Sequence, residues 1–416
     1  RDGLIAAVGA HEDLRAAHPD ARALDLGGGV LLPGFVNAHT HLYSALARGM
    51  PVPGEPASNF IEILERLWWR LDRALEPADI EVSALVTLAE CARAGVTAVI
   101  DHHSSPNACP GSLDAIRRAA RAVGVRVCTC CEVSDRDGEA AARAAIEENA
   151  RFARSLRADP EPLVRAMFGI HAPFTVSEET LGTCVRTARA EGLGLHLHAS
   201  EDRGDVERNV ERHGVRPVER LARHGALGPG TLAAHCVHVD AREIELLAES
   251  GAAVAHNPRS NMGNAVGFAP VREMLDRGVL VGLGTDGCSA DMLDEMRAAI
   301  AIARHASGDP RQGPAEAQRM AFDGNARIAS AIFGVQLGAI EPGAAADMVA
   351  LDYDPPTPLD AANLLGHLLH GVSSRHVAAT MVAGRVVFAG GRIASLDERD
   401  LAARARERAA GLWRRL

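Results

Sequence analysis

The sequence predicts an α/β fold, a (β/α)8 barrel with a small β-sandwich built from both chain ends, and three observations lead to it. Short apolar runs rich in Val, Ala and Leu alternate with longer amphipathic stretches, the pattern of strand–helix units around a parallel sheet. The apolar runs number eight, which suits a closed barrel. No glycine-rich phosphate loop follows the first run, which argues against an open dinucleotide-binding sheet.

The barrel elements are expected between residues 33 and 335. The predicted strands are residues 31–41, 96–102, 125–131, 163–171, 193–199, 231–236, 252–257 and 280–286. Helices are expected between them, where apolar residues recur at three-to-four spacing, at residues 76–94, 112–123, 139–156, 177–191 and 240–250. Ser112, Ser177 and Asp240 are residue types that cap helix N-termini.

The two ends of the chain follow a different pattern. Residues 3–26 and 336–395 resemble short strands joined by glycine turns. We therefore expect residues 1–32 and 336–395 to form one small sandwich. An Arg-rich amphipathic helix is expected over residues 396–416.

Composition excludes several classes of protein. The chain has 44 basic and 54 acidic residues, a formal charge of −10, and its basic residues are scattered, so a nucleic-acid binder is not expected. No apolar run reaches the roughly 18 residues of a membrane helix, and no secretory signal pattern opens the sequence, so we expect a cytoplasmic protein. All 44 basic residues are arginine, which removes lysine Schiff-base chemistry and a carbamylated lysine bridging two metal ions. The eight cysteines lack paired metal spacing and are expected to be buried, reduced thiols.

Three histidines and one aspartate fall at the carboxyl ends of predicted strands, where barrel enzymes build their sites. His39 and His41 end the first strand on the same face, because side chains two apart on a strand point the same way. His198 ends the fifth strand and Asp286 the eighth. This set suits one divalent metal ion, zinc or iron(II), with a position left open for water.

Other polar residues lie near the same strand ends. Glu201 follows His198 by three residues and is a candidate proton shuttle, although an acid stabilised at a helix N-terminus fits that position too. His235 ends the sixth strand. Trp68 and Trp69 suit core packing at least as well as stacking on a substrate ring. Further candidates for lining the mouth and binding substrate are His103, Arg136, His171, Arg259 and Asn261.

At this point the sequence resembles the amidohydrolase superfamily, in its cytosine-deaminase-like branch of aromatic aminohydrolases and chlorohydrolases. The strings that carry the resemblance are Leu32-Pro-Gly-Phe-Val-Asn-Ala-His-Thr-His41, Leu197-His-Ala-Ser-Glu201, Ala234-His-Cys236, His256-Asn-Pro-Arg-Ser-Asn261 and Gly284-Thr-Asp286. Within the branch the chain is most similar to the SsnA-type aminohydrolases. Four strings carry this closer likeness: Trp68-Trp-Arg-Leu-Asp72, Val99-Ile-Asp-His-His103, His171-Ala-Pro-Phe-Thr-Val176 and Ser289-Ala-Asp-Met-Leu-Asp-Glu-Met296.

The resemblance covers nearly the whole chain and implies a distorted barrel, a flanking sandwich, usually a zinc ion, and a homodimer. It implies that His39, His41, His198 and Asp286 are metal ligands and that Glu201 is the proton shuttle. His235 would hydrogen-bond the attacking water or the developing oxyanion. One departure concerns the pocket: the stretch after Asp286 lacks an Asn common in the branch and carries Cys288, Asp291 and Asp294 instead.

The expected reaction is hydrolytic deamination of a cyclic amidine or guanidine-like carbon in a small heterocycle of the nucleobase, pterin or triazine type. In this scheme Asp286 accepts a proton from water, and Glu201 protonates the ring nitrogen and helps ammonia leave. The same site would also suit ring-amide hydrolysis, N-dealkylation or dechlorination. A non-catalytic scaffold is a remote alternative, because the complete ligand set argues against it.

Overall fold

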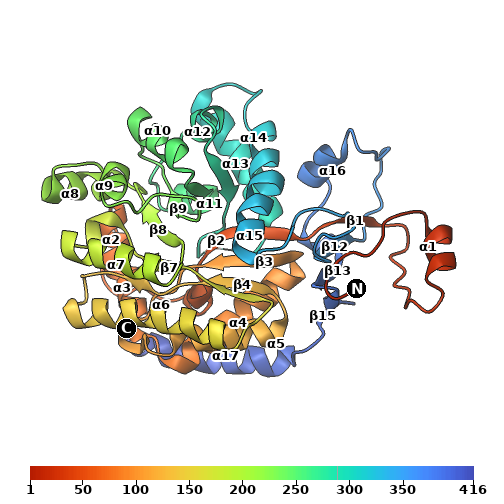
Figure 1. The fold of residues 1–416 in the computed structure, drawn as a ribbon, viewed down its shortest axis with the longest axis horizontal. Coiled ribbons are helices and arrows are strands. Elements are labelled where there is room, and N and C mark those ends of the chain that lie inside the picture. The colour runs from red at the N-terminus through yellow and green to blue at the C-terminus, as the bar shows by residue number, and fades with distance from the viewer. Residues whose placement is uncertain (288) are drawn as a thin grey trace.

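The computed structural model describes residues 1–287 and 289–416 and shows an α/β protein whose parallel strands surround a common centre (Figure 1). One parallel sheet has the order β2-β3-β4-β6 and the other β11-β10-β9-β8-β7-β5. The strands are β2 (Phe35–Thr40), β3 (Val96–Asp101), β4 (Arg126–Thr129), β5 (Glu132–Val133), β6 (Val164–Ala166), β7 (Phe168–Ile170), β8 (Leu195–Ala199), β9 (Leu232–His235), β10 (Ala253–His256) and β11 (Leu280–Leu283).

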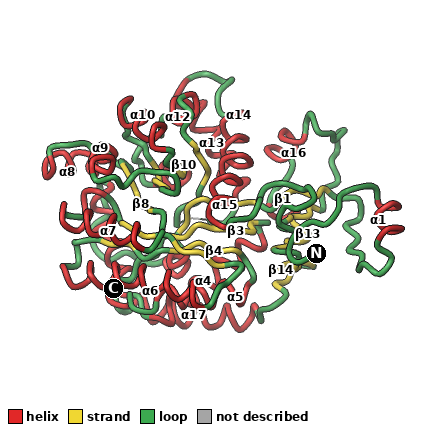
Figure 2. Tube along the Cα trace, in the orientation of Figure 1, coloured by secondary structure: helices red, strands yellow, loops and turns green. Residues whose placement is uncertain are grey.

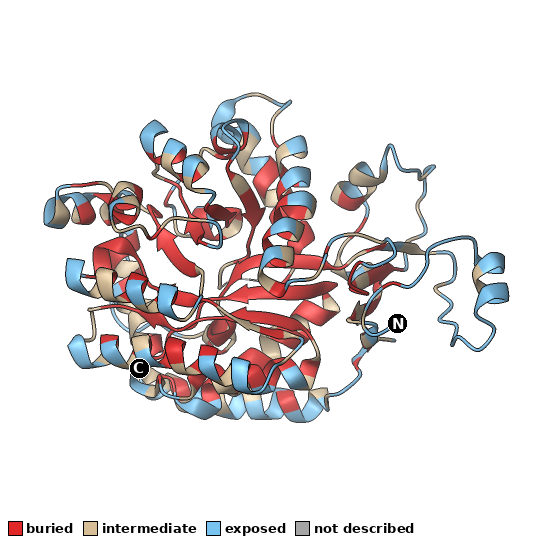
Figure 3. Ribbon diagram, in the orientation of Figure 1, coloured by how far each residue is buried: buried red, intermediate tan, exposed pale blue. Residues whose placement is uncertain are grey.

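The two sheets join at both edges. A parallel bridge pairs Thr40, at the end of β2, with Asp286, just after β11. On the other side the predicted strand 163–171 is divided into β6 and β7, and a further short strand, β5, follows the predicted strand 125–131. As a result β4 and β6 pair in one sheet while β5 and β7 pair in the other. The interior is filled by small, fully buried side chains such as Ala38, Ala98 and Ala255. Most residues of these strands are buried (Figure 3).

Helices lie outside the strands (Figure 2). The longer ones are α4 (Pro77–Arg93), α5 (Ser112–Val123), α6 (Glu139–Ala158), α7 (Glu178–Ala190), α8 (Arg203–His213), α10 (Ala241–Ser250), α13 (Met292–Ser307) and α15 (Asn325–Phe333). Ser177 and Asp240 cap α7 and α10, as their residue types predict. Ser112 does not cap α5, because Gly111 takes the N-cap position with φ of 83° and Ser112 becomes the first helical residue.

Short helical segments fill the connections. They are η1 (Leu42–Ala47), α2 (Phe60–Ile63), η2 (Leu64–Trp68), α3 (Trp69–Ala74), η3 (Pro106–Ala108), η4 (Pro173–Thr175), α9 (Pro217–Arg223), α11 (Pro258–Gly263), α12 (Val271–Asp276), α14 (Pro314–Gln318), η5 (Arg319–Gly324), α16 (Leu364–His370) and η6 (Ser374–His376). Among the described helices, none combines the length and apolarity needed to cross a membrane.

The chain ends share an antiparallel sheet of order β1-β12-β13-β14-β15 beside the barrel (Figure 1). Its strands are β1 (Val30–Pro33), β12 (Met348–Leu351), β13 (Val377–Val382), β14 (Arg385–Ala389) and β15 (Arg392–Ile393). The predicted strand 31–41 is therefore two strands in different sheets. Gly34 separates them, and its lack of a side chain is required there, because a Cβ would lie 2.2 Å from Thr97 Cγ2.

The prediction of short strands over residues 3–26 is wrong. This segment contributes one antiparallel bridge, Leu4 with Ala345, and the exposed helix α1 (His11–Ala17). The sequence of α1 has acidic residues in its first turn, which is favourable in a helix. Its apolar and polar residues do not alternate regularly, as those of a half-buried strand would. The C-terminal helix α17 (Glu398–Trp413) packs on α4, and Arg408 Nε lies 2.7 Å from Asp79 Oδ1.

Candidate metal centre and active site

The candidate ligands and proton-transfer residues converge at the carboxyl ends of the barrel strands. His39 lies in β2 and His41 directly follows it, His198 lies in β8, His235 ends β9, and Asp286 follows β11. His235 has φ of 75° and Asp286 has φ of 55°. Residues other than glycine seldom adopt this left-handed conformation, and it is found preferentially at functional sites. In His235 and Asp286 this left-handed conformation occurs where the chain turns away from the end of its strand.

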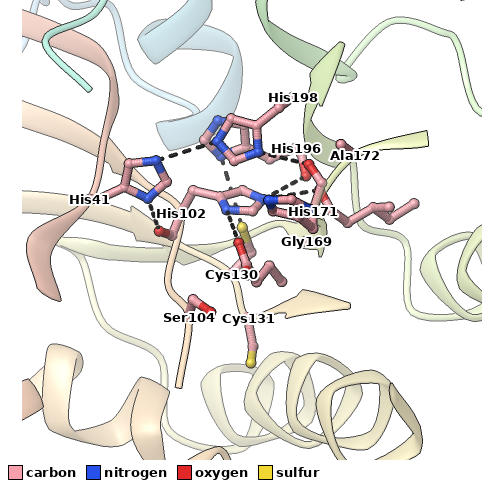
Figure 4. Close-up of polar contacts among 12 residues, drawn as sticks. His41, His102, Ser104, Cys130, Cys131, Gly169, His171, Ala172, His196 and His198 are labelled. Carbon is pink, nitrogen blue, oxygen red and sulfur yellow. Dashed lines mark hydrogen bonds and ion pairs between the residues drawn. The ribbon is translucent and has the colours of Figure 1, made fainter. Parts of the chain in front are cut away.

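The facing atoms of this group are all potential metal ligands. Asp286 Oδ1 lies 2.9 Å from His41 Nε2 and 3.3 Å from His39 Nε2. His41 Nε2 lies 3.3 Å from His198 Nε2, and Figure 4 shows these two rings facing each other. In a tetrahedral zinc site, bonds of 2.0–2.1 Å put neighbouring ligand atoms about 3.3 Å apart. The spacing of these side chains therefore suits a single small cation between them.

Each histidine is oriented through its other ring nitrogen. Nδ1 of His41 lies 2.6 Å from the carbonyl of His102, and Nδ1 of His198 lies 2.7 Å from the carbonyl of His171. Nδ1 of His39 lies 2.9 Å from Nε2 of His196. A carbonyl only accepts, so Nδ1 of His41 and of His198 carries the hydrogen and Nε2 keeps its lone pair for a metal. His196, one layer deeper on the same strand as His198, thus holds the ring of His39.

The charges fit a cation as well. Burial opposes ionisation of Asp286, but hydrogen bonds from His39 and His41 hold the pKa of its carboxyl well below the ordinary value. Burial lowers the pKa of His39 to about 3. Burial also opposes protonation of His41, yet its hydrogen bond to Asp286 raises the pKa of His41 to about 9. With no metal bound, a proton on His41 therefore supplies the positive charge beside the carboxylate of Asp286. A divalent metal would supply that charge instead and would leave Nε2 of His41 unprotonated, as a ligand must be.

The group of four side chains whose ligand atoms all lie within 4.8 Å of one another consists of His39, His198, His235 and Asp286. His41 belongs to a second group, with His102 and His198, and contacts Asp286 separately. His235 is thus close enough to act as a ligand in place of His41. Two differences separate them: His235 Nδ1 faces a side chain, Asn261 Oδ1 at 2.8 Å, and His235 Nε2 lies 3.4 Å from Glu201 Oε2. Its second nitrogen therefore faces the candidate proton shuttle.

Glu201 is buried at the start of the loop that leads into α8. Its backbone N–H donates to Asp205 Oδ2 over 3.0 Å. Burial raises the pKa of Glu201 well above the ordinary value, and the negative charges of Asp286 and Asp205 raise it further. This raised pKa favours the protonated carboxyl, the form that a general acid requires.

A pocket of about 50 Å³ opens over this cluster, and its walls are aromatic and acidic. Glu201, His235, His198, His41 and Asp286 line its floor. Around them stand Tyr43, Phe60, Leu64, Trp68, Trp69, Asp72, Glu132, His171, Phe174, Asp205 and Asn264. Trp68 and Trp69 face this pocket, and both come from the η2–α3 segment that closes one side.

Of the five residues predicted to bind substrate, only His171 is on the wall of this pocket. His103 Nε2 lies 2.8 Å from Ser105 Oγ. Arg136 is buried in ion pairs, with Nη2 2.6 Å from Asp72 Oδ2, and its guanidinium stacks on Trp69. Arg259 lies near Glu295, and Asn261 lies behind His235.

Three acidic wall residues, Asp72, Glu132 and Asp205, were not predicted. Glu132 begins β5, just past the predicted strand 125–131, so the rule that sites form at the carboxyl ends of strands could have found it. Asp205 lies in α8. Asp72 lies on a connecting helix, where no such rule applies. In the stretch after Asp286, Asp291 caps α13 and Asp294 pairs with Arg297, while Cys288 lies outside the described residues.

Comparison with known proteins gives consistent matches over the whole chain. A model described as "Amidohydrolase family" matches residues 30–387, and one described as "Imidazolonepropionase-like composite domain, bacteria" matches residues 1–21. A 5-methylthioadenosine/S-adenosylhomocysteine deaminase of Pelotomaculum thermopropionicum is 34% identical over 431 residues, covering 100% of this chain and 95% of that protein. A 5'-deoxyadenosine deaminase of Methanopyrus kandleri is 33% identical over 410 residues, covering 96% of this chain and 91% of that protein.

A solved structure shares the architecture. The crystal structure of an adenosine deaminase from Xanthomonas campestris with bound zinc has a TM-score of 0.85 and 26% identity, covering 100% of this chain and 93% of that one. The likeness therefore extends over both the barrel and the terminal sheet.

Proposed function

Because the chain belongs to the amidohydrolase family, we propose that it is a metal-dependent deaminase that hydrolyses the exocyclic C–N bond of a 6-aminopurine nucleoside or a similar heterocycle. The observation that carries the proposal is the convergence of three Nε2 atoms and one carboxylate beside Glu201, whose pKa burial raises well above the ordinary value. The named relatives deaminate adenine nucleosides, which places this substrate class first among the heterocycles expected from the sequence.

The metal centre in this proposal is mononuclear and consists of His39, His41, His198 and Asp286. Zinc is the expected ion, because the structurally similar adenosine deaminase contains it, and iron(II) suits the same ligands. A divalent ion there supplies Lewis acidity and lowers the pKa of a bound water towards about 7.

The remaining steps belong to the protein's own side chains. Asp286 is held ionised and is able to accept a proton from the attacking water. Glu201, whose pKa is raised well above the ordinary value, donates a proton to the ring nitrogen next to the reacting carbon. The proton taken up by Asp286 then passes to the amino group, which leaves as ammonia when the C–N bond breaks. Burial lowers the pKa of His235, so its neutral Nε2 accepts a hydrogen bond from the attacking water and orients it.

The pocket walls suit a nucleoside. Trp68, Trp69 and Tyr43 offer aromatic faces to a planar base. Asp72 Oδ1 is buried on the same wall and, within the described residues, has no hydrogen-bond partner, so it is available to a sugar hydroxyl.

The finer features expected from the sequence are part of this proposal. They are a distorted barrel over residues 33–335 that carries the reaction, a sandwich from residues 1–32 and 336–395, a helix over 396–416, a cytoplasmic location and a homodimer. Packing of Ile5 against Ala344 and Ala346 supports the pairing of the two ends. Sedimentation velocity tests the dimer.

The function is tested by measuring ammonia release from protein whose metal content has been counted. The panel contains adenosine, 5'-methylthioadenosine, 5'-deoxyadenosine, S-adenosylhomocysteine, guanine, a pterin and a chlorotriazine. Ammonia from an adenine nucleoside, absent in Glu201→Gln, supports the proposal. Chloride release without ammonia, or a protein that binds no metal, contradicts it.

A further inference from the structure

We propose that two neighbouring residues of the short helix α11, Ser260 and Asn261, are positioning residues of the active site. Ser260 fixes the carboxylate of Asp286, and Asn261 fixes the ring of His235. The inference rests on the proposed function and changes the role of Asn261 from substrate binding to orientation of a catalytic group.

Ser260 holds the carboxylate in one rotation. Its hydroxyl donates to Asp286 Oδ2 over 2.5 Å, while Oδ1 of the same carboxylate faces His39 and His41. The backbone of Asp286 is already fixed, because its N–H donates to the carbonyl of His39 over 3.0 Å and its carbonyl accepts from the Thr40 hydroxyl over 2.9 Å. Rotation of the carboxylate is the freedom that remains, and a short charge-assisted hydrogen bond removes it.

Asn261 determines which nitrogen of His235 carries the hydrogen. Its Oδ1, which only accepts, lies 2.8 Å from His235 Nδ1, so the hydrogen is on Nδ1 and the lone pair is on Nε2. Nε2 is the atom that lies 3.4 Å from Glu201 Oε2 in the pocket. Loss of the Asn261 oxygen would allow the other tautomer, which presents an N–H where the attacking water needs an acceptor.

The topology explains why one helix reaches both groups. β10 lies between β9 and β11 in the parallel sheet, and α11 begins two residues after β10 ends. Adjacent side chains from its first turn therefore reach the ends of the strand on either side. The helix is itself anchored, because the N–H of Arg259 donates to the buried carboxylate of Glu295 over 3.3 Å.

The experiment uses two truncations, Ser260→Ala and Asn261→Ala, each with a conservative partner that keeps the hydrogen-bonding atom, Ser260→Thr and Asn261→Asp. The Asn261→Asp exchange sacrifices no bond, since Asn261 Nδ2 has no partner among the described residues. Met262→Ala is the matched control, because this neighbour on α11 is exposed. The readouts are the affinity of the metal-free protein for Zn²⁺ by chelator competition, kcat and KM, and thermal unfolding.

We expect Ser260→Ala to weaken Zn²⁺ binding by about 10- to 100-fold, as loss of a bond to a ligand does, and to lower kcat with KM changed less than about twofold. Asn261→Ala should leave Zn²⁺ affinity unchanged and lower kcat by about tenfold or more. Ser260→Thr should retain most of the Zn²⁺ affinity and kcat that Ser260→Ala loses. Asn261→Asp should retain most of the kcat that Asn261→Ala loses.

Three results would overturn the inference. They are truncations whose kcat and Zn²⁺ affinity stay within about twofold of the unmodified protein, conservative variants as impaired as the truncations, or equal loss of Zn²⁺ affinity in both truncations. If the unmodified protein releases no ammonia from any probe, the proposed function fails. The Zn²⁺ series still tests the role of Ser260 in that case.

Discussion

A buried ion pair ties the barrel to the terminal sheet, and breaking it should destabilise the protein measurably. Arg126, at the start of β4, binds Asp347, just before β12, through two bonds of 2.8 and 2.9 Å. Their side chains are 6% and 1% exposed. The same carboxylate accepts the N–H of Ala383 over 2.8 Å, and the guanidinium stacks on Phe333. Arg126→Met would leave this carboxylate buried without its counter-charge.

The magnitude follows from burial. Removing one partner of a buried ion pair costs about 3–5 kcal/mol, because the other charge is left unpaired in the interior. At about 2.1 cal/mol/K per residue, a chain of 416 residues has an unfolding entropy near 0.9 kcal/mol/K, so Tm should fall by roughly 3–6 °C.

The assay is differential scanning calorimetry at matched metal content, because a bound ion itself raises Tm. Arg399→Met, which removes an exposed arginine from α17, should change Tm by less than about 1 °C. The double variant Arg126→Met/Asp347→Asn should recover part of the loss, since it removes the unpaired charge. A decrease in Tm of less than about 1 °C for Arg126→Met would refute the reasoning. So would a double variant with a lower Tm than the single variant.

Three other predictions concern the site and its surroundings. Glu201→Gln should keep its metal and lose about 10²- to 10⁴-fold in kcat, because the amide cannot donate an acidic proton; assayed at matched metal content, full activity would exclude the shuttle role. His198→Ala should lose metal while His235→Ala retains it, measured by mass spectrometry after gel filtration; the opposite order would make His235 the ligand. Burial raises the pKa of Glu295 to about 8, so folding favours its protonated form, and stability should decline as pH rises from about 4.5 to 8. Glu295→Gln should reduce the slope of Tm against pH over that range without abolishing it, because Asp72 and Asp205 have pKa values raised to about 7. An unchanged slope would contradict the role of Glu295.

The eight strands could be predicted from short apolar runs, and the last residues of each run mark the carboxyl end of its strand. The clustering of the candidate ligands could be predicted for the same reason, because they lie at these ends. His198 and Asp286 are 88 positions apart, yet both could be placed at the same end of one barrel. The division of the fourth predicted strand and the short strand β5 after the third could not be predicted, since they depend on how β5 and β7 pair across the gap. The helix at residues 11–17 was missed because glycine turns on both sides favoured strands.

The substrate pocket was the hardest part to predict, because non-local ion pairs decide where long side chains point. Arg136 follows the third strand and was expected to face substrate, but Asp72, 64 positions earlier, holds its guanidinium away from the pocket. Asn261 was expected at the mouth and lies behind His235 instead. Neither partner is recognisable without the fold.

We propose that one metal ion and proton donation by Glu201 together bring about deamination of a heterocycle. The most direct test is ammonia release from adenine nucleosides by protein of counted metal content, with Glu201→Gln measured alongside. We expect one divalent ion per chain in both proteins, and ammonia with the corresponding hydroxypurine from the unmodified protein alone. One ion per chain in both proteins, with equal ammonia release from both or none from either, would contradict it.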